Sequence, residues 1–187
     1  MVLLHVCAHN PTGVDPTQDQ WKDILQVIKQ KSHFVIFDSA YQGFASGDLD
    51  KDAYALKLFT SEYDRIMLFQ SFAKNFGLYG ERAGCMSLVT GSKDEKEIVV
   101  SRVKQLARML WSNPPIHGAR IVDIILSDPE LTKEWHHELK VMSGRLADMR
   151  TGLRQRLEKL NSPHNWQHIT DQIGMFAFTG LTKEMVD

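Results

Sequence analysis

Residues 33–44 read His-Phe-Val-Ile-Phe-Asp-Ser-Ala-Tyr-Gln-Gly-Phe, in which a short apolar run ends directly at an acidic residue. The run, Phe34 to Phe37, is rich in β-branched and aromatic side chains, as is typical of a buried β-strand. Comparable runs occur at Val2 to Val6, Ile66 to Phe69 and Cys85 to Val89. Polar or glycine-containing segments bound each run, so the sequence predicts four strands that look buried on both faces.

Segments with helical periodicity lie between and after these runs. The first has Asp15-Pro16 as N-cap and first-turn proline, and its apolar residues lie at i, i+3, i+4 and i+7, namely Trp21, Ile24, Leu25 and Ile28. A second begins with a capping box at Ser92 and Glu95 and continues with one apolar face, Val99, Val103, Leu106 and Leu110. Alternating strands and helices favour an α/β sheet between helical layers, with ligands beyond the strand ends.

The longest periodic pattern runs from Leu131 to Leu160 with spacings of three and four residues and no interior proline. It predicts a helix over about 129–160, roughly 30 residues and about 45 Å long, which suits a strut between two domains. Its Met and Trp residues are interpreted as core. The last residues, 181–187, resemble the first turns of another helix, and the chain starts directly in a strand. We therefore expect both ends to be cut.

Composition excludes several function classes. The 187 residues carry Lys+Arg 22 against Asp+Glu 23, a net charge of -1, which does not indicate a nucleic-acid partner. Cys7 and Cys85 lack CxxC spacing, which argues against a disulfide scaffold or a metal site and favours buried free thiols in a reducing compartment. No run reaches the roughly 18 to 20 apolar residues that a membrane span requires.

Two segments carry the residues best suited to chemistry. Asp38 comes directly after a predicted strand and Tyr41 follows three residues later, so both are expected in one cleft. Lys74 lies in a loop with aromatic and glycine neighbours, Gln-Ser-Phe-Ala-Lys-Asn-Phe-Gly-Leu-Tyr-Gly-Glu-Arg at 70–82. A desolvated lysine can form an imine with a carbonyl compound, and Ser71 and Arg82 could bind a phosphate. Read singly, such residues are more often a cap and a surface lysine.

Five motifs occur in the order and approximate spacing of the aspartate aminotransferases, which are pyridoxal 5'-phosphate-dependent enzymes. Besides the lysine segment they are His-Asn-Pro-Thr-Gly at 9–13, Asp-Ser-Ala-Tyr-Gln-Gly-Phe-Ala-Ser-Gly at 38–47, Trp-Ser-Asn-Pro-Pro at 111–115 and His-Ile-Thr-Asp-Gln-Ile-Gly-Met-Phe at 168–176. The chain resembles this family along its whole length. The resemblance implies a three-layer α/β/α sandwich, with the C-terminal part of the large cofactor domain at 1–141 and the beginning of a small α+β domain at 142–187.

The resemblance also implies a reaction, the reversible transfer of an amino group between L-aspartate and 2-oxoglutarate. Lys74 resembles the lysine that holds the cofactor as a Schiff base and then moves a proton as general base and acid. Asp38 resembles the carboxylate that pairs with the pyridine nitrogen and keeps it protonated. Tyr41 and Asn10 resemble the groups that hydrogen-bond the ring oxygen O3'. The resemblance also implies that Asn10 contacts the substrate.

Further residues would bind the anionic groups of cofactor and substrate. Ser71 and Arg82 match phosphate ligands of the family. Arg108 resembles the arginine that binds the side-chain carboxylate of the substrate in the neighbouring subunit's site, which implies a homodimer with shared active sites. Without the family it reads as an exposed arginine at a helix C-terminus. His5 and His9 are candidates for supporting Asp38 from behind, or are satisfied core histidines.

Family members are about twice as long, and the expected missing parts include the glycine-containing phosphate loop, the ring that stacks on the cofactor and the arginine for the α-carboxylate. The alternative is therefore a catalytically incomplete fragment acting only as a folded or dimerising scaffold. A second rival rests on Ser71-Phe-Ala-Lys74, formally the S-x-x-K motif of serine β-lactamases, but the S-D-N and K-T-G tripeptides do not occur. Three of the motifs resemble the cytosolic more than the mitochondrial form, which predicts a cytoplasmic location.

Overall fold

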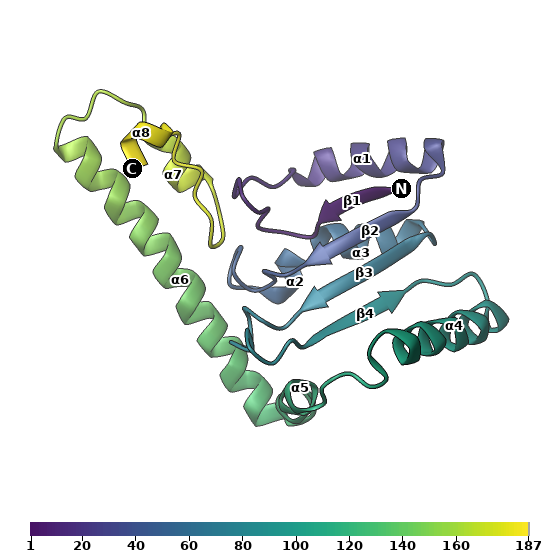
Figure 1. The fold of residues 1–187 in the computed structure, drawn as a ribbon. Helices are drawn as coiled ribbons and strands as arrows, with labels where there is room; N and C mark the ends of the chain where they lie inside the picture. The colour runs from purple at the N-terminus through teal and green to yellow at the C-terminus, as the bar shows by residue number, and fades with distance from the viewer. Residues whose placement is uncertain (187) are drawn as a thin grey trace.

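The computed structural model describes residues 1–186 and contains one four-stranded mixed sheet with helices around it (Figure 1). In chain order the elements are β1 (Val2–His5), α1 (Gln18–Lys31), β2 (Val35–Ser39), α2 (Leu49–Asp52), α3 (Tyr54–Glu62), β3 (Ile66–Ser71), β4 (Gly84–Leu88), α4 (Lys93–Trp111), α5 (His117–Ser127), α6 (Pro129–Lys159), α7 (Gln167–Asp171) and α8 (Lys183–Val186). The spatial order is β1-β2-β3-β4; the first three strands are parallel, and β4 is antiparallel to β3.

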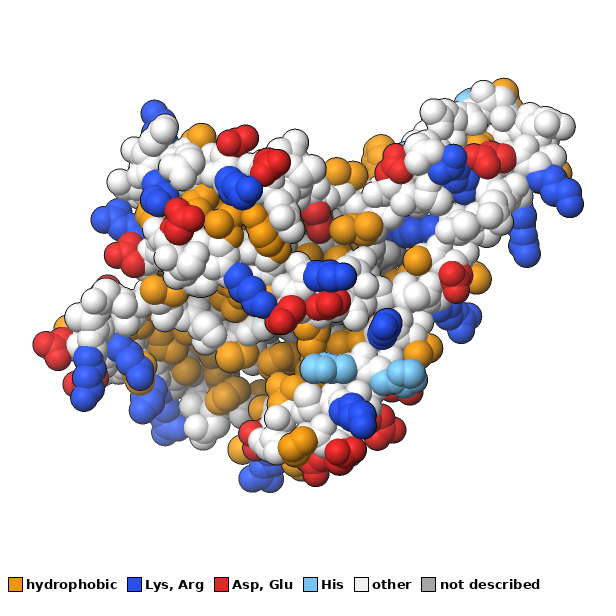
Figure 2. Space-filling view, turned by 180° about the vertical axis from the view of Figure 1, so that it is seen from behind, with side chains coloured by type: hydrophobic (Ala, Val, Ile, Leu, Met, Phe, Trp, Pro, Cys, Tyr) orange, Lys and Arg blue, Asp and Glu red, His pale blue; other side chains and the backbone are white. Residues whose placement is uncertain are grey.

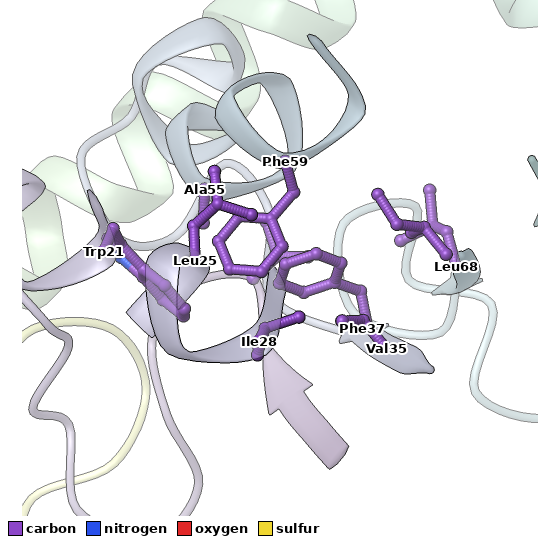
Figure 3. Packing of buried hydrophobic residues seen from close by; sticks show 10 residues of the cluster. Trp21, Leu25, Ile28, Val35, Phe37, Ala55, Phe59 and Leu68 are labelled. Atoms are coloured by element: carbon purple, nitrogen blue, oxygen red, sulfur yellow. The ribbon is translucent and has the colours of Figure 1, made fainter. Parts of the chain in front are cut away.

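The core lies between the sheet and helices α1 and α3 (Figure 3). Trp21 and Leu25 of α1 and Phe59 of α3 pack on Phe37 of β2, and the rings of Phe37 and Phe59 meet edge to face at 5.1 Å. Fully burying a side chain of this size contributes about 1.5–3 kcal/mol. The prediction from the i, i+3, i+4, i+7 spacing of the first helix is confirmed, because these residues form one apolar face that packs against the sheet.

The strands are not buried on both faces, contrary to the sequence-based expectation. In β2 the residues Val35, Phe37 and Ser39 are buried while Ile36 and Asp38 between them are partly exposed. In β4 the first four residues are all exposed. The reason is that α1 and α3 cover one face only in the described residues. Cys85 therefore lies exposed on β4, whereas Cys7 is buried as expected.

Helix α1 does not start at the predicted cap. Its N-cap is Thr17, which forms a reciprocal capping box with Gln20. The carboxylate of Asp15 instead accepts hydrogen bonds from the backbone N–H groups of Ala8 (2.6 Å) and His9 (2.9 Å). Asp15 is thus committed to the loop after β1 and is not available to cap the helix.

Helix α4 begins at Ser92 as predicted, with the Ser92 hydroxyl accepting from the backbone N–H of Glu95 at 3.1 Å. The predicted capping box is only half formed, because the Glu95 carboxylate accepts from the Gly91 N–H at 2.7 Å instead of the Ser92 N–H. None of its residues is buried, and the apolar side chains of Leu106 and Leu110 remain more than half exposed. Hydrophobic side chains also lie open at the surface in the lower part of Figure 2. Exposed apolar surface of this extent is typical of a face that another protein segment covers.

The long helix over about 129–160 is present as α6, which has 31 residues and Asp128 as its N-cap. It passes the ends toward which β1, β2 and β3 point (Figure 1). Leu139 and Ser143 are its buried residues, whereas Met142 and Met149 are exposed, so the interpretation of its methionines as core is wrong. A helix that packs along one narrow stripe leaves its other faces to solvent.

The chain end expected to start a helix forms α8, and Asp187 lies outside the described residues. Helix α5 and the pair α2 and α3 were not predicted from sequence. Among residues 1–186, the structure has no helix that combines the length and apolar character needed to cross a bilayer.

Candidate active site

The parallel strands bring three loops to one edge of the sheet. His5, Asp38 and Phe69 are aligned across β1, β2 and β3, so the chain leaves all three strands at nearly the same level. In open α/β sheets the carboxyl ends of parallel strands are where ligands bind. The predicted cleft residues follow these strands, on the loops 6–17, 40–48 and 72–83.

Lys74, Tyr41 and Asn10 come together at this edge although they are far apart in the sequence. The Lys74 Nζ atom lies 5.0 Å from the centre of the Tyr41 ring, within the range of a cation–π contact. The Asn10 side-chain amide donates a hydrogen bond to the Tyr41 hydroxyl at 3.3 Å. One amine, one phenol and one amide from three separate loops thus form a cluster that no local pattern required.

The loop that carries Tyr41 is held by a buried carboxylate. Asp52, which is 5% exposed, accepts hydrogen bonds from the backbone N–H groups of Gly43, Ala45 and Ser46 and from the Ser46 hydroxyl. Burial raises the pKa of Asp52, and these hydrogen bonds act in the opposite direction. The four donors fix the path of the chain directly after Tyr41, which positions the phenol.

The loop that carries Asn10 is held by polar contacts of its own. Besides the carboxylate of Asp15, the His9 Nδ1 and Thr12 Oγ1 atoms lie 2.7 Å apart. His5 Nδ1 accepts from the backbone N–H of Asn10 at 3.3 Å, and the rings of His5 and His9 are 4.6 Å apart. His5 is paired with Asp38 on the neighbouring strand. Its ring nitrogen holds the backbone of Asn10.

A segment from the far end of the chain covers Tyr41. The Phe176 ring packs edge to face on the Tyr41 ring at 5.3 Å, and Tyr41 is only 6% exposed. The Ile173 N–H donates to the Gly13 carbonyl at 2.8 Å. Gly13 has a φ of +65°, and an added Cβ would lie 2.8 Å from the Phe176 carbonyl oxygen. Glycine is required here for both its conformation and the close approach.

Arg150 of α6 ties this segment in place. Its guanidinium donates to the carbonyls of Ile169 (3.1 Å) and Gly174 (2.9 Å) and to that of Phe176. Burial lowers the pKa of Arg150 relative to a free arginine. Because arginine has five fixed donors, one side chain can collect three carbonyls of an irregular segment and hold them on a helix.

Ser71 and Arg82 are far apart along the chain, and their side chains have separate hydrogen-bond partners. The Phe72 N–H donates to the Ala83 carbonyl at 3.1 Å, which sets the two residues on adjacent chain segments. The Ser71 hydroxyl accepts from the Ala73 N–H at 3.2 Å. The exposed Arg82 guanidinium donates to the Tyr79 carbonyl at 3.1 Å.

Arg108 lies on α4, away from the strand ends that carry the cluster. Its side chain is exposed, and its guanidinium donates to the Ser112 hydroxyl at the end of the same helix. Asp38 sits at the strand ends at intermediate exposure. Of the predicted residues, the fold therefore gathers Lys74, Tyr41 and Asn10 directly, places Asp38 and Ser71 at the same edge and leaves Arg82 and Arg108 exposed.

Sequence reasoning missed several residues that organise the site. Asp52 and Arg150 belong to no motif, and Asp52 lies in a segment for which no helix was predicted. Phe176 lies in the motif at 168–176, but nothing local shows that it covers Tyr41. Trp135 was read as core, and it is in fact bound to the lysine loop. Only their long-range partners could have revealed these roles.

Comparisons with known proteins show the family and the fold of this chain. The family model described as aminotransferase class I and II matches residues 1–187. The mitochondrial aspartate aminotransferase of Arabidopsis thaliana is 55% identical over 185 residues, which cover 99% of this chain and 43% of that protein. The broad specificity aminotransferase of Leishmania mexicana superimposes with a TM-score of 0.95 at 51% identity, covering 97% of this chain and 45% of that one.

A third solved structure is the aromatic-amino-acid aminotransferase of Burkholderia pseudomallei, described as covalently bound to pyridoxal phosphate. It is 42% identical with a TM-score of 0.93 and covers 96% of this chain and 45% of that one. The fold and the cluster thus define an α/β protein of the aminotransferase type, as the sequence predicted. This chain belongs to the class I and II aminotransferase family, and it spans less than half the length of the relatives it matches.

Proposed function

We propose that this protein catalyses the reversible transfer of an amino group between L-aspartate and 2-oxoglutarate, giving oxaloacetate and L-glutamate, with pyridoxal 5'-phosphate as cofactor. The observation that carries the proposal is the cluster of Lys74, Tyr41 and Asn10 at the strand ends. The match to relatives named aspartate aminotransferases supports the substrate assignment. When bound, the cofactor supplies an aldehyde that links to amines and a ring that accepts an electron pair.

The donor set fits the chemical groups of pyridoxal 5'-phosphate. Lys74 offers an amine for the aldehyde, Asp38 a carboxylate for the ring nitrogen, and Tyr41 with Asn10 two hydrogen-bonding groups for the ring oxygen. Lys74 is neither fully buried nor fully exposed, and it lies against the aromatic rings of Tyr41 and Tyr79.

Lys74 would act as the proton carrier. Its amine would serve as general base and general acid for the proton at the substrate Cα. The contact between Nζ and the Tyr41 ring supports this role, because it keeps the amine at the strand ends without consuming it in a salt bridge. Asp38 would hold a proton on the ring nitrogen by its negative charge.

Ser71 and Arg82 would bind the phosphate group, with the guanidinium turning from the Tyr79 carbonyl toward the anion. Arg108 would bind the side-chain carboxylate of the substrate in the site of a second copy, in a homodimer with shared active sites. Two observations support this: Arg108 is exposed on α4, and the same helix exposes apolar side chains at Leu106 and Met109.

Two further assignments belong to the proposal. Residues 1–141 would be part of a large cofactor domain and 142–187 the beginning of a small domain, joined by α6. A cytoplasmic location rests on the resemblance of three motifs to the cytosolic form, although four curated relatives at 54–56% identity are all named as mitochondrial. Fractionation of native cells with an antibody against this chain tests the location.

The reaction is tested by adding pyridoxal 5'-phosphate to the purified protein and recording the visible spectrum against pH. We expect a yellow, pH-dependent absorbance in the wild type, none in Lys74→Ala, and a wild-type spectrum in Lys22→Ala, because Lys22 is an exposed partner of Asp19 on α1. Turnover is measured as oxaloacetate formed from aspartate and 2-oxoglutarate.

The outcomes separate the three candidate roles. Colour that is lost in Lys74→Ala supports cofactor attachment at Lys74. Absence of colour in the wild type would contradict the proposal and favour the scaffold alternative. Acylation of Ser71 by a β-lactam would contradict it in a different way, in favour of the S-x-x-K reading.

A further inference from the structure

The turn that carries Lys74 is fixed from outside rather than by its own hydrogen bonds alone. Within the turn, the Gly77 N–H donates to the Lys74 carbonyl at 3.1 Å. The neighbours of the lysine, Ala73 and Asn75, are buried at 5% and 8% exposure. The Phe76 N–H donates to the Phe72 carbonyl at 3.3 Å. A short turn with two local hydrogen bonds has little stiffness of its own, so its direction depends on what those buried neighbours contact.

Trp135 of α6 makes two contacts with this turn. Its indole Nε1–H donates to the Asn75 carbonyl at 2.8 Å. Its ring stacks on the Phe76 ring with a centroid separation of 4.3 Å and an interplanar angle of 16°. The hydrogen bond holds the carbonyl of the residue after Lys74, and the stack holds the ring of the next residue, so Trp135 restrains the turn at two consecutive residues.

Helix α6 supports the Tyr41 loop as well. The Leu139 side chain packs against Gly43, where an added Cβ would meet it at 3.0 Å, and the Ser143 hydroxyl donates to the Phe44 carbonyl at 3.5 Å. Trp135 and Leu139 are four residues apart and lie on the same face of the helix. The lysine turn and the phenol loop therefore rest on consecutive turns of one rigid element.

We propose that Trp135 is a positioning residue for Lys74, a role that rests on the proposed function. By bonding the Asn75 carbonyl and stacking on Phe76, it aims the lysine amine at the Tyr41 ring, where the reacting atoms would lie. Misplacement of a reacting group by about 1 Å costs on the order of a hundredfold in rate. Loss of the hydrogen bond from Trp135 should displace the turn by less than about 1 Å, so we expect the reaction rate of the lysine amine to fall about tenfold.

The test measures how fast the Lys74 amine engages the aldehyde, without requiring turnover. Protein and pyridoxal 5'-phosphate are mixed at several pH values, borohydride converts the lysine adduct into a stable secondary amine at set times, and peptide mass spectrometry quantifies labelling at each lysine. Trp135→Phe keeps an aromatic ring but has no donor. Phe76→Leu keeps the indole donor but removes the stack. Trp21→Phe is the matched control, because Trp21 belongs to the core under α1.

We expect labelling of Lys74 to slow about tenfold in Trp135→Phe, while the other lysines are labelled at the wild-type rate. Phe76→Leu should change in the same direction, and Trp21→Phe should label like the wild type even where its melting temperature falls. If Lys74 is labelled at the wild-type rate in both Trp135→Phe and Phe76→Leu, Trp135 does not position Lys74. If Trp21→Phe slows as much as they do, the effect is general destabilisation and the inference fails. If the wild type is not labelled at Lys74, the proposed function itself is overturned, and this inference with it.

Discussion

Replacing Arg150 by methionine should release the segment that covers Tyr41 while leaving the sheet folded. The guanidinium donates to three carbonyls, those of Ile169, Gly174 and Phe176. Hydrogen bonds from a charged donor contribute about 1.5–3 kcal/mol each when buried. The side chain is partly exposed and the three bonds act as one unit, so we take about 3 kcal/mol for the whole contact.

That free energy translates into local opening. At about 1.4 kcal/mol per factor of ten, 3 kcal/mol raises the open population of the segment roughly a hundredfold. Two amides report on it: the Ile173 N–H, which donates to the Gly13 carbonyl at 2.8 Å, and the Phe178 N–H, which donates to the Gln172 side chain at 2.7 Å. Native-state hydrogen exchange should therefore speed up about a hundredfold at both amides, and amides of β2 should exchange as before.

Arg145→Met is the matched control, because Arg145 lies on the same helix with its side chain exposed. It should leave exchange at Ile173 and Phe178 unchanged. Arg150→Lys should restore part of the protection, since an ammonium group can reach one carbonyl but cannot span three. Wild-type exchange rates at both amides in Arg150→Met would refute the reasoning, and so would an equal acceleration in β2, which would mean that the whole chain unfolds.

Three further predictions concern the loops and the thiols. Asp52→Asn should lower the free energy of unfolding by about 2 kcal/mol in a urea titration. In the variant, an amide nitrogen would take the place of a carboxylate oxygen that accepts hydrogen bonds from backbone N–H groups in the wild type. An unchanged urea midpoint would contradict this. Gly13→Ala should lower the melting temperature more than Gly77→Ala. The two glycines have nearly the same φ, +65° and +67°, but of the two only Gly13 would place the new Cβ against backbone atoms, the closest at 2.8 Å. Equal decreases in melting temperature would show that the close approach costs nothing. A thiol reagent should modify exposed Cys85 in the folded protein and Cys7 only after denaturation, because burial raises the pKa of the Cys7 thiol; reaction of both thiols at one rate would contradict the buried position of Cys7.

Local physics determined the elements. The apolar run at 34–37 and the spacing of Trp21, Leu25 and Ile28 predicted β2 and α1, since a strand or helix must bury one face wherever it lies in the fold. The uninterrupted period from Leu131 to Leu160 predicted α6 almost to its ends. The motif that contains Lys74 predicted a reactive lysine because its neighbours and its resemblance are both encoded locally.

Tertiary structure decided which residues meet. Asp15 reads as a helix cap, yet the amides of Ala8 and His9 take its carboxylate and leave the cap to Thr17. Cys85 reads as buried, yet it lies on a strand that no helix of the described chain covers. No sequence signal predicts the loop contacts of Arg150 and Trp135, because their hydrogen-bond partners lie 19 to 60 residues away. Hydrogen-bond partners chosen over such separations depend on the relative placement of helix and loops, which no local pattern contains.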